Sequence, residues 1–120
     1  VGIVVSRARG CQYCTGAFCT ILVHGLGEDK LKAKELVSKG ASALVSNSRI
    51  KYLTEFTEKV NNNPRGIADE DIKTLQGTGL SGKGTIQLIH LVSDFASHKR
   101  LNLALETDYD YQDFGKLENV

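Results

Sequence analysis

Apolar residues recur every three or four positions along most of this chain, and clusters of Gly, Asn or Pro separate the periodic segments. Residues three or four apart share one face of a helix, so the spacing predicts amphipathic helices. We expect helices over residues 11–26, 28–38 and 49–60, a short helix with Asp69 as its N-cap, and a long helix from Ser81 to about Leu105. No alternating strand pattern bounded by hairpin turns is present, which predicts an all-α helical bundle.

Both ends of the sequence are harder to interpret. The Val and Ile residues of segment 1–9 favour a strand, whereas the Ser-Arg-Ala-Arg run before Gly10 is typical of a helix that ends at Gly. Segment 106–114 is acidic and aromatic, which predicts either an ordered tail packed on a neighbour or a frayed end.

One glycine-rich stretch, Gly77 to Thr85, nearly matches the phosphate-binding loop G-x-x-x-x-G-K-[ST]. Gly84 stands where that motif needs the Ser or Thr that holds Mg²⁺, and the stretch follows a helix pattern rather than a buried strand. We therefore interpret it as a turn between two helices.

Composition narrows the class of protein. The 120 residues carry 15 basic and 14 acidic side chains, and neither end holds a run of like charge. We expect a single domain over 1–120 that binds neither nucleic acid nor a membrane, since its apolar runs are also too short to cross a bilayer. The sequence contains no Met, and we expect further chain, including any targeting peptide, before Val1.

The strongest chemical signal is the pair Cys11 and Cys14, spaced as C-x-x-C where a helix is predicted to begin. A thiolate in the first turn is stabilised by free backbone N–H groups and by the helix dipole, which favours redox chemistry. Two alternatives stay open: half of a zinc site, for which only Cys19 and three His remain as further ligands, and inert buried cysteines. An odd cysteine count fits a transient disulfide in a reducing cytoplasm better than a secreted scaffold.

The order of motifs along the chain resembles the alkyl hydroperoxidase D / carboxymuconolactone decarboxylase family. The resemblance begins with Cys-x-Tyr-Cys on an apolar helix that ends in Gly, and it covers nearly the whole sequence. The other matching segments are Phe-x-x-Lys-Val (56–60) with Pro64, Ala68-Asp-Glu-Asp-Ile72, Leu75 with Gly79-Leu80-Ser81, and 86–105 with Phe95, Arg100 and Ala104-Leu105.

This resemblance implies an alkyl hydroperoxidase D-like helical bundle that assembles as a homo-oligomer, a trimer or hexamer. It also implies a peroxiredoxin-type, thiol-dependent peroxidase with an antioxidant role and no bound cofactor. Cys14 matches the peroxidatic thiol, which a hydroperoxide oxidises to a sulfenic acid, and Cys11 matches the resolving thiol, which closes the redox-active disulfide. An external dithiol, such as a lipoyl-type reductant protein, then reduces that disulfide.

Two relay groups of the family are not found at their positions. Its peroxidases carry a His four residues after the second cysteine, where this chain has Phe18, and a Glu that would lie before Val1. His90, in the long last helix, is the remaining candidate for a base near the thiols, although an isolated His among apolar neighbours is more often a core group. Tyr13 is a candidate proton donor to a peroxide oxygen, or a structural anchor.

Two functional hypotheses follow. The first is a hydroperoxide-reducing enzyme that uses Cys11 and Cys14. The second is a non-peroxidatic member of the family, either a decarboxylase-like enzyme or a redox-sensing or structural oligomer. Phe18 in place of the relay His favours the second, and the intact cysteine pair favours the first.

Overall fold

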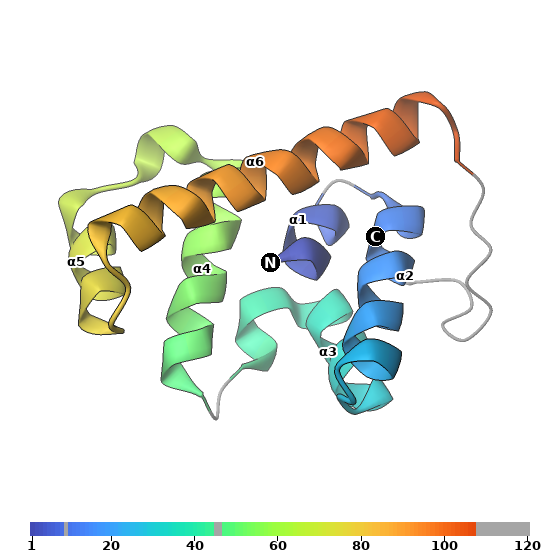
Figure 1. Ribbon diagram of the computed structural model, residues 1–120, viewed down its shortest axis with the longest axis horizontal. Coiled ribbons are helices and arrows are strands. Elements are labelled where there is room, and N and C mark those ends of the chain that lie inside the picture. The colour runs from blue at the N-terminus through green and yellow to red at the C-terminus, as the bar shows by residue number, and fades with distance from the viewer. Residues whose placement is uncertain (9, 45–46, 108–120) are drawn as a thin grey trace.

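The long helix α6 (Gly82–Ala104) lies across the other helices of the chain (Figure 1). The computed structural model describes residues 1–8, 10–44 and 47–107, and every regular element within them is helical. The all-α prediction is confirmed for this part of the chain. The other elements are α1 (Gly2–Arg7), α2 (Gln12–Thr20) with a wider π-helical continuation (Ile21–Gly25), α3 (Lys30–Lys39), a 3₁₀ turn (Gly40–Ala43), α4 (Ser48–Asn62), a 3₁₀ turn (Pro64–Gly66) and α5 (Asp69–Gly77).

The short helix α1 lies in the middle of the bundle, below α6 and between α4 and α2 (Figure 1). Its residues from Gly2 to Ser6 are all buried, so packing on every side outweighs the strand preference of its Val and Ile residues. The structure thus decides the ambiguous first segment in favour of a helix. Arg9 and residues 108–114 of the predicted tail lie outside the described residues.

The main hydrophobic cluster joins α1, α2 and α3. Its fully enclosed members are Ile3, Cys19, Ala33 and Val37, and Phe18 and Leu22 pack against it. Gly2 is required at its position because a Cβ atom there would lie only 2.6 Å from the ring of Phe18. The N-terminal helix therefore packs closely on α2 at Gly2.

Side-chain caps begin several of the helices. Ser81 accepts the backbone N–H of Gly84 at 3.0 Å, which confirms the predicted start of α6, and Asn47 accepts that of Ile50 at 3.1 Å at the start of α4. The prediction that Asp69 caps α5 was wrong. Ala68 holds the N-cap position, and the Asp71 carboxylate accepts the N–H of Ala68 at 2.8 Å from within the first turn.

Acid should weaken the start of α5. The pKa of the Asp71 carboxyl is lowered from its ordinary value, first by the backbone N–H of Ala68 and then by the hydrogen bond from Lys59. A lowered folded-state pKa contributes stability above the ordinary pKa, and this contribution is lost as the pH falls through the folded value. We expect Asp71→Asn to lower the melting temperature at neutral pH and to match the wild type in acid.

The control for this prediction is Asp69→Asn, which removes the same charge from the same exposed first turn without a bond to Ala68. Melting curves of the three proteins between about pH 7 and about pH 2 give the comparison. If the difference between Asp71→Asn and the wild type were independent of pH, the assigned cap would be wrong.

The last helix buries only a narrow stripe. Thr85, Val92 and Lys99 are its buried residues, whereas many of its apolar side chains stay exposed. Lys99 is 1% exposed and donates to the carbonyl of Val5 at 3.3 Å, at the C-terminal end of α1. A cation is favourable at that end of a helix dipole. This contact ties α6 to the central helix.

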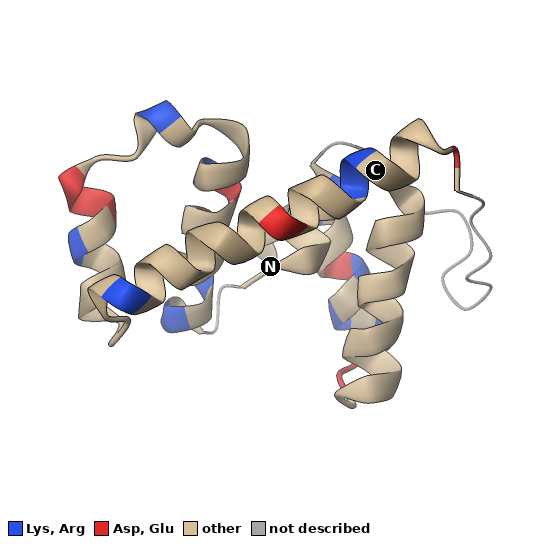
Figure 2. Ribbon diagram, turned by 45° about the horizontal axis from the view of Figure 1, so that its top comes forward, with Lys and Arg blue, Asp and Glu red and all other residues tan. Residues whose placement is uncertain are grey.

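The glycine-rich stretch that resembles a phosphate loop forms the turn between α5 and α6, as predicted, with Gly79 in the left-handed region at φ 93°. Charged residues are sparse along the length of α6 (Figure 2). Even so, no helix in the described ranges combines the length and apolar character needed to cross a bilayer.

Candidate functional site

Cys11 and Cys14 form a disulfide at the start of α2, with their Cα atoms 5.4 Å apart. Cys11 is the N-cap residue, in extended backbone conformation, and Cys14 lies within the first turn of the helix. Both residues are buried, at 1% and 5% exposure. The predicted position of the pair at a helix start is confirmed, and the pairing is consistent with a redox couple.

The sulfur of Cys11 receives a backbone hydrogen bond. The N–H of Cys14 donates to Cys11 Sγ at 3.3 Å, so the sulfur occupies the place of a capping oxygen. The hydroxyl of Thr15 donates to the carbonyl of Cys11 at 2.8 Å and fixes the turn from the other side. Such an arrangement stabilises negative charge on the Cys11 sulfur when the pair is reduced.

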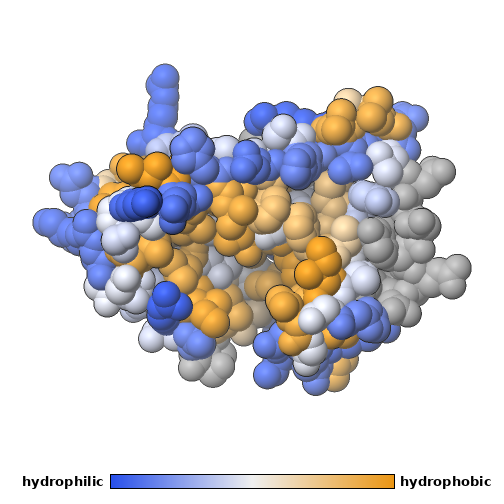
Figure 3. All heavy atoms as spheres, in the orientation of Figure 1, coloured by the Kyte–Doolittle hydropathy of each residue, from blue (hydrophilic) through white to orange (hydrophobic). Residues whose placement is uncertain are grey.

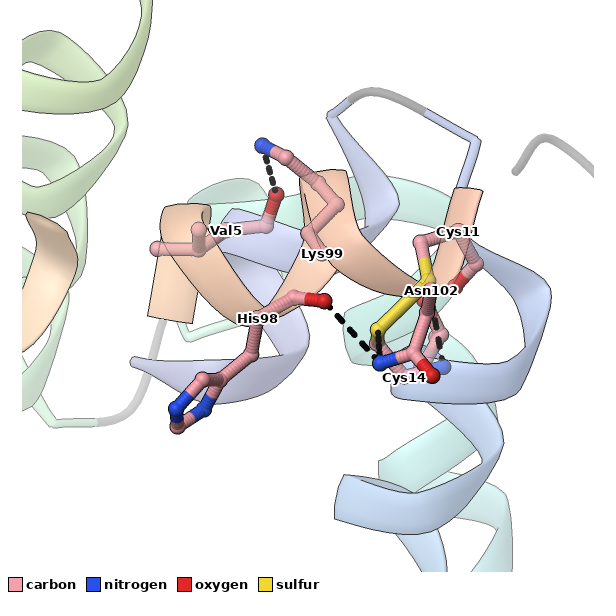
Figure 4. Close-up of a disulfide and its surroundings, with 7 residues drawn as sticks. Val5, Cys11, Cys14, His98, Lys99 and Asn102 are labelled. Atoms are coloured by element: carbon pink, nitrogen blue, oxygen red, sulfur yellow. Dashed lines mark hydrogen bonds between the residues drawn. A yellow bond between two sulfur atoms is a disulfide. The ribbon is translucent and has the colours of Figure 1, made fainter. Parts of the chain in front are cut away.

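The sulfur of Cys14 has a donor from the opposite end of the chain. The side-chain amide of Asn102, near the end of α6, donates to Cys14 Sγ at 3.4 Å (Figure 4). The same amide nitrogen donates to the backbone carbonyl of His98 at 3.0 Å. Sequence analysis missed Asn102, and no local pattern marks it, because the contact joins residues 88 positions apart.

The position that carries the relay His in the family is occupied by a packing residue here. The ring of Phe18 lies 4.7 Å from the ring of Phe95 at a 60° angle, and its other side faces Gly2. Phe18 thus joins α2 to α6 and α1 through apolar contacts. An aromatic hydrocarbon ring has no group that can accept or donate a proton.

The structure does not bring His90 to the thiols. Its side chain is exposed, and it lies on α6 about 18 Å along the helix axis from Asn102. The expectation that its apolar neighbours hold it in the core was wrong, because α6 turns most of those neighbours outward. His98 is exposed, and only its carbonyl faces the site, with the ring directed away from the disulfide (Figure 4).

A shallow pocket of about 310 Å³ adjoins the cysteine pair. Tyr13 and Asn102 both line it, so the candidate donor predicted from the sequence lies beside the residue that contacts Cys14. The remaining lining residues come from the start of α2 and the end of α6: Gly10, Cys11, Gln12, Leu103, Glu106 and Thr107.

The third cysteine stands apart from this chemistry. Cys19 is fully buried in the hydrophobic cluster and is not disulfide-bonded. Burial raises the pKa of its thiol to about 11, which keeps it protonated at neutral pH. A protonated thiol is a poor nucleophile, so Cys19 serves as a small core residue.

Across residues 1–8, 10–44 and 47–107, no three His, Cys, Asp or Glu side chains gather as the ligands of a metal ion would. The chemistry of the site therefore centres on two sulfurs, one backbone donor and one amide donor. No model of a known protein family and no curated protein matches this sequence, so the case for a function rests on the geometry around Cys11 and Cys14.

Proposed function

We propose that this protein is a thiol-dependent peroxidase of the alkyl hydroperoxidase D type, in which Cys14 is oxidised and Cys11 resolves it. The observation that carries the proposal is the Cys11–Cys14 disulfide at the start of a helix, with a hydrogen-bond donor on each sulfur. Each donor stabilises the thiolate, which is the reactive form in both peroxide reduction and disulfide exchange.

The proposed cycle has three steps. The Cys14 thiolate attacks the terminal oxygen of a hydroperoxide, the O–O bond breaks, and with one proton taken up an alcohol leaves and Cys14 becomes a sulfenic acid. The Cys11 thiol then attacks the Cys14 sulfur, and water leaves as the disulfide forms. An external dithiol passes two electrons and two protons to the disulfide and becomes a disulfide itself.

The pocket beside the pair limits the substrate. Its volume of about 310 Å³ is at the lower end of the range for small-molecule sites. Gln12, Tyr13, Asn102 and Thr107 contribute polar groups to its lining, and Leu103 supplies an apolar side. We infer that it admits a small organic hydroperoxide or hydrogen peroxide. The reductant, a dithiol or lipoyl-type protein of a reducing cytoplasm, is a further part of this proposal.

One observation favours the alternative, a non-peroxidatic redox sensor or structural oligomer. Phe18 contacts Phe95 and Gly2 where the relay His of the family would lie, and no described His reaches Cys14 in its place. A protein without that relay keeps the disulfide chemistry and loses acid–base help in the peroxide step. The two functions therefore differ in the rate of peroxide consumption.

We also propose that the chain assembles with copies of itself, as a trimer or hexamer. Apolar side chains remain at the surface at both ends of α6, among them Ile86 and Leu101, each 59% exposed (Figure 3). Apolar side chains that stay exposed in a single chain are often buried at protein–protein interfaces. The same face of one helix would then contact a second copy of the chain.

The test of the peroxidase is consumption of cumene hydroperoxide or hydrogen peroxide in the presence of a small dithiol. We expect the wild type to turn over and Cys14→Ser to be inactive. Cys11→Ser should consume one equivalent of peroxide and stop with a sulfenic acid on Cys14, which a dimedone adduct detected by mass spectrometry would locate. Thiol counting on the wild type should show two thiols lost together.

Cys19→Ser is the matched control, because it removes a thiol that is buried away from the pair, and it should retain wild-type turnover. Equal rates for the wild type and Cys14→Ser would rule out the peroxidase. Reversible disulfide formation without catalytic turnover would support the redox sensor instead.

A further inference from the structure

The side chain of Asn102 reaches the reacting sulfur from a helix at the other end of the chain. Its amide nitrogen lies 3.4 Å from Cys14 Sγ and 3.0 Å from the carbonyl oxygen of His98. Figure 4 shows the amide lying beside the disulfide, with both contacts on the same nitrogen. A primary amide nitrogen carries two hydrogens, and these two contacts use both of them.

The contact with His98 decides which end of the amide meets the sulfur. A backbone carbonyl only accepts hydrogen bonds, so it requires the NH₂ group of Asn102 and not its oxygen. The hydrogen directed at Cys14 is therefore a true donor, held in place by the backbone of α6. A flipped amide would set two oxygens against each other and lose both bonds.

The surroundings hold this donor in place. Lys99, one helical turn before Asn102, is buried and bonded to the carbonyl of Val5, which fixes α6 against α1. Phe95 packs on Phe18 of α2 one further turn away. The last turns of α6 are thus tied to both α1 and α2, and residue 102 has little freedom to move from the sulfur.

We propose that Asn102 is a catalytic residue of this site, which stabilises Cys14 as a thiolate through its N–H donor. The inference rests on the proposed function. A hydrogen bond to a charged acceptor is about twice as strong as one between neutral groups, so the amide favours the ionised sulfur over the protonated one. Asn102 supplies to Cys14 what the backbone N–H supplies to Cys11. The amide thus favours ionisation of Cys14 without a His, although the site lacks a His to protonate the leaving alkoxide.

The test measures the titration of Cys14 alone. In a Cys11→Ser, Cys19→Ser background Cys14 is the sole thiol, and the ultraviolet absorbance of its thiolate reports its pKa. Asn102→Leu removes the donor at similar volume and should raise the pKa of Cys14 by about one unit, which lowers the thiolate fraction about tenfold below that pKa. Asn102→Asp places a carboxylate beside the sulfur and should raise the pKa further.

Gln87→Glu adds the same charge at an exposed position of α6, far from the thiols, and should leave the pKa of Cys14 unchanged. The proposal is supported if the pKa of Cys14 rises from the parent to Asn102→Leu and again to Asn102→Asp, in variants that keep the circular dichroism of the wild type. Equal pKa values in folded Asn102→Leu and the parent would overturn it. This titration is independent of the peroxidase assay. If the pKa of Cys14 is lower in the parent than in Asn102→Leu but the protein consumes no peroxide, the enzyme is rejected and the effect of Asn102 on the thiolate is retained.

Discussion

We expect the proposed peroxide turnover to be about 10²–10⁴-fold slower than that of a peroxidase of the resembled family, which carries a His where this chain has Phe18, because that is the usual contribution of general acid–base catalysis. The amide of Asn102 stabilises a thiolate but cannot deliver a proton to the departing alkoxide. Phe18→His should raise kcat for the peroxide step. The relay of the resembled family also uses a Glu, so the full gain requires a carboxylate beside the new His.

The matched control for Phe18→His is Phe18→Leu, which loses the contact with the ring of Phe95 without gaining a base. Loss of an aromatic pair costs about 0.5–1.5 kcal/mol, so both variants should unfold at a lower temperature than the wild type. A gain in turnover for Phe18→His but not for Phe18→Leu identifies the His as the missing proton relay. An equal or lower rate in a folded His variant would show that another group already protonates the leaving alkoxide.

Dissociation of the protein into single chains is expected to accompany unfolding. Each of the exposed apolar residues of α6 would contribute about 1.5–3 kcal/mol if an interface buried it, and several of them together exceed the stability of many domains. The double variant Ile86→Glu, Leu101→Glu places charges on this surface and should shift sedimentation toward the single chain and lower the melting temperature by several degrees.

Gln76→Glu on α5 serves as the control, because it adds a charge of the same sign at a polar exposed position outside α6. The melting temperature of the wild type should also rise with protein concentration. A stable, folded particle of 13.1 kDa at micromolar concentration would contradict the assembly.

Local signals predicted the helices well. The start of α6 at Ser81 and the start of α2 at the cysteine pair follow from capping, which depends on a few neighbouring residues. Asp69 misled the prediction because Asp71, two residues on, reaches back to the same turn. The first segment was undecidable from its own residues, since burial on all sides of α1 decides between helix and strand there.

The two contacts that complete the site could not be predicted. Lys99 is buried on α6 while Ile86 and Leu101 are exposed, which inverts the usual order of burial for these residue types. Asn102 meets Cys14 only because α6 packs across α1 and α2. The residues of a single helix do not reveal which other helices it will pack against. Sequence reasoning could find the sulfurs, but their donor from α6 depended on the tertiary structure.

The sulfur of Cys11 acts as the cap of α2, and this has a consequence for the speed of the redox change. A thiolate at that position can accept the N–H of Cys14 as the disulfide sulfur does, so we expect the first turn of the helix to persist when the pair is reduced. A sensor needs an element that changes shape between two states, and this turn is common to both. The proposed redox cycle would then need little reorganisation of the backbone, which is an argument for repeated cycling over the transmission of a signal.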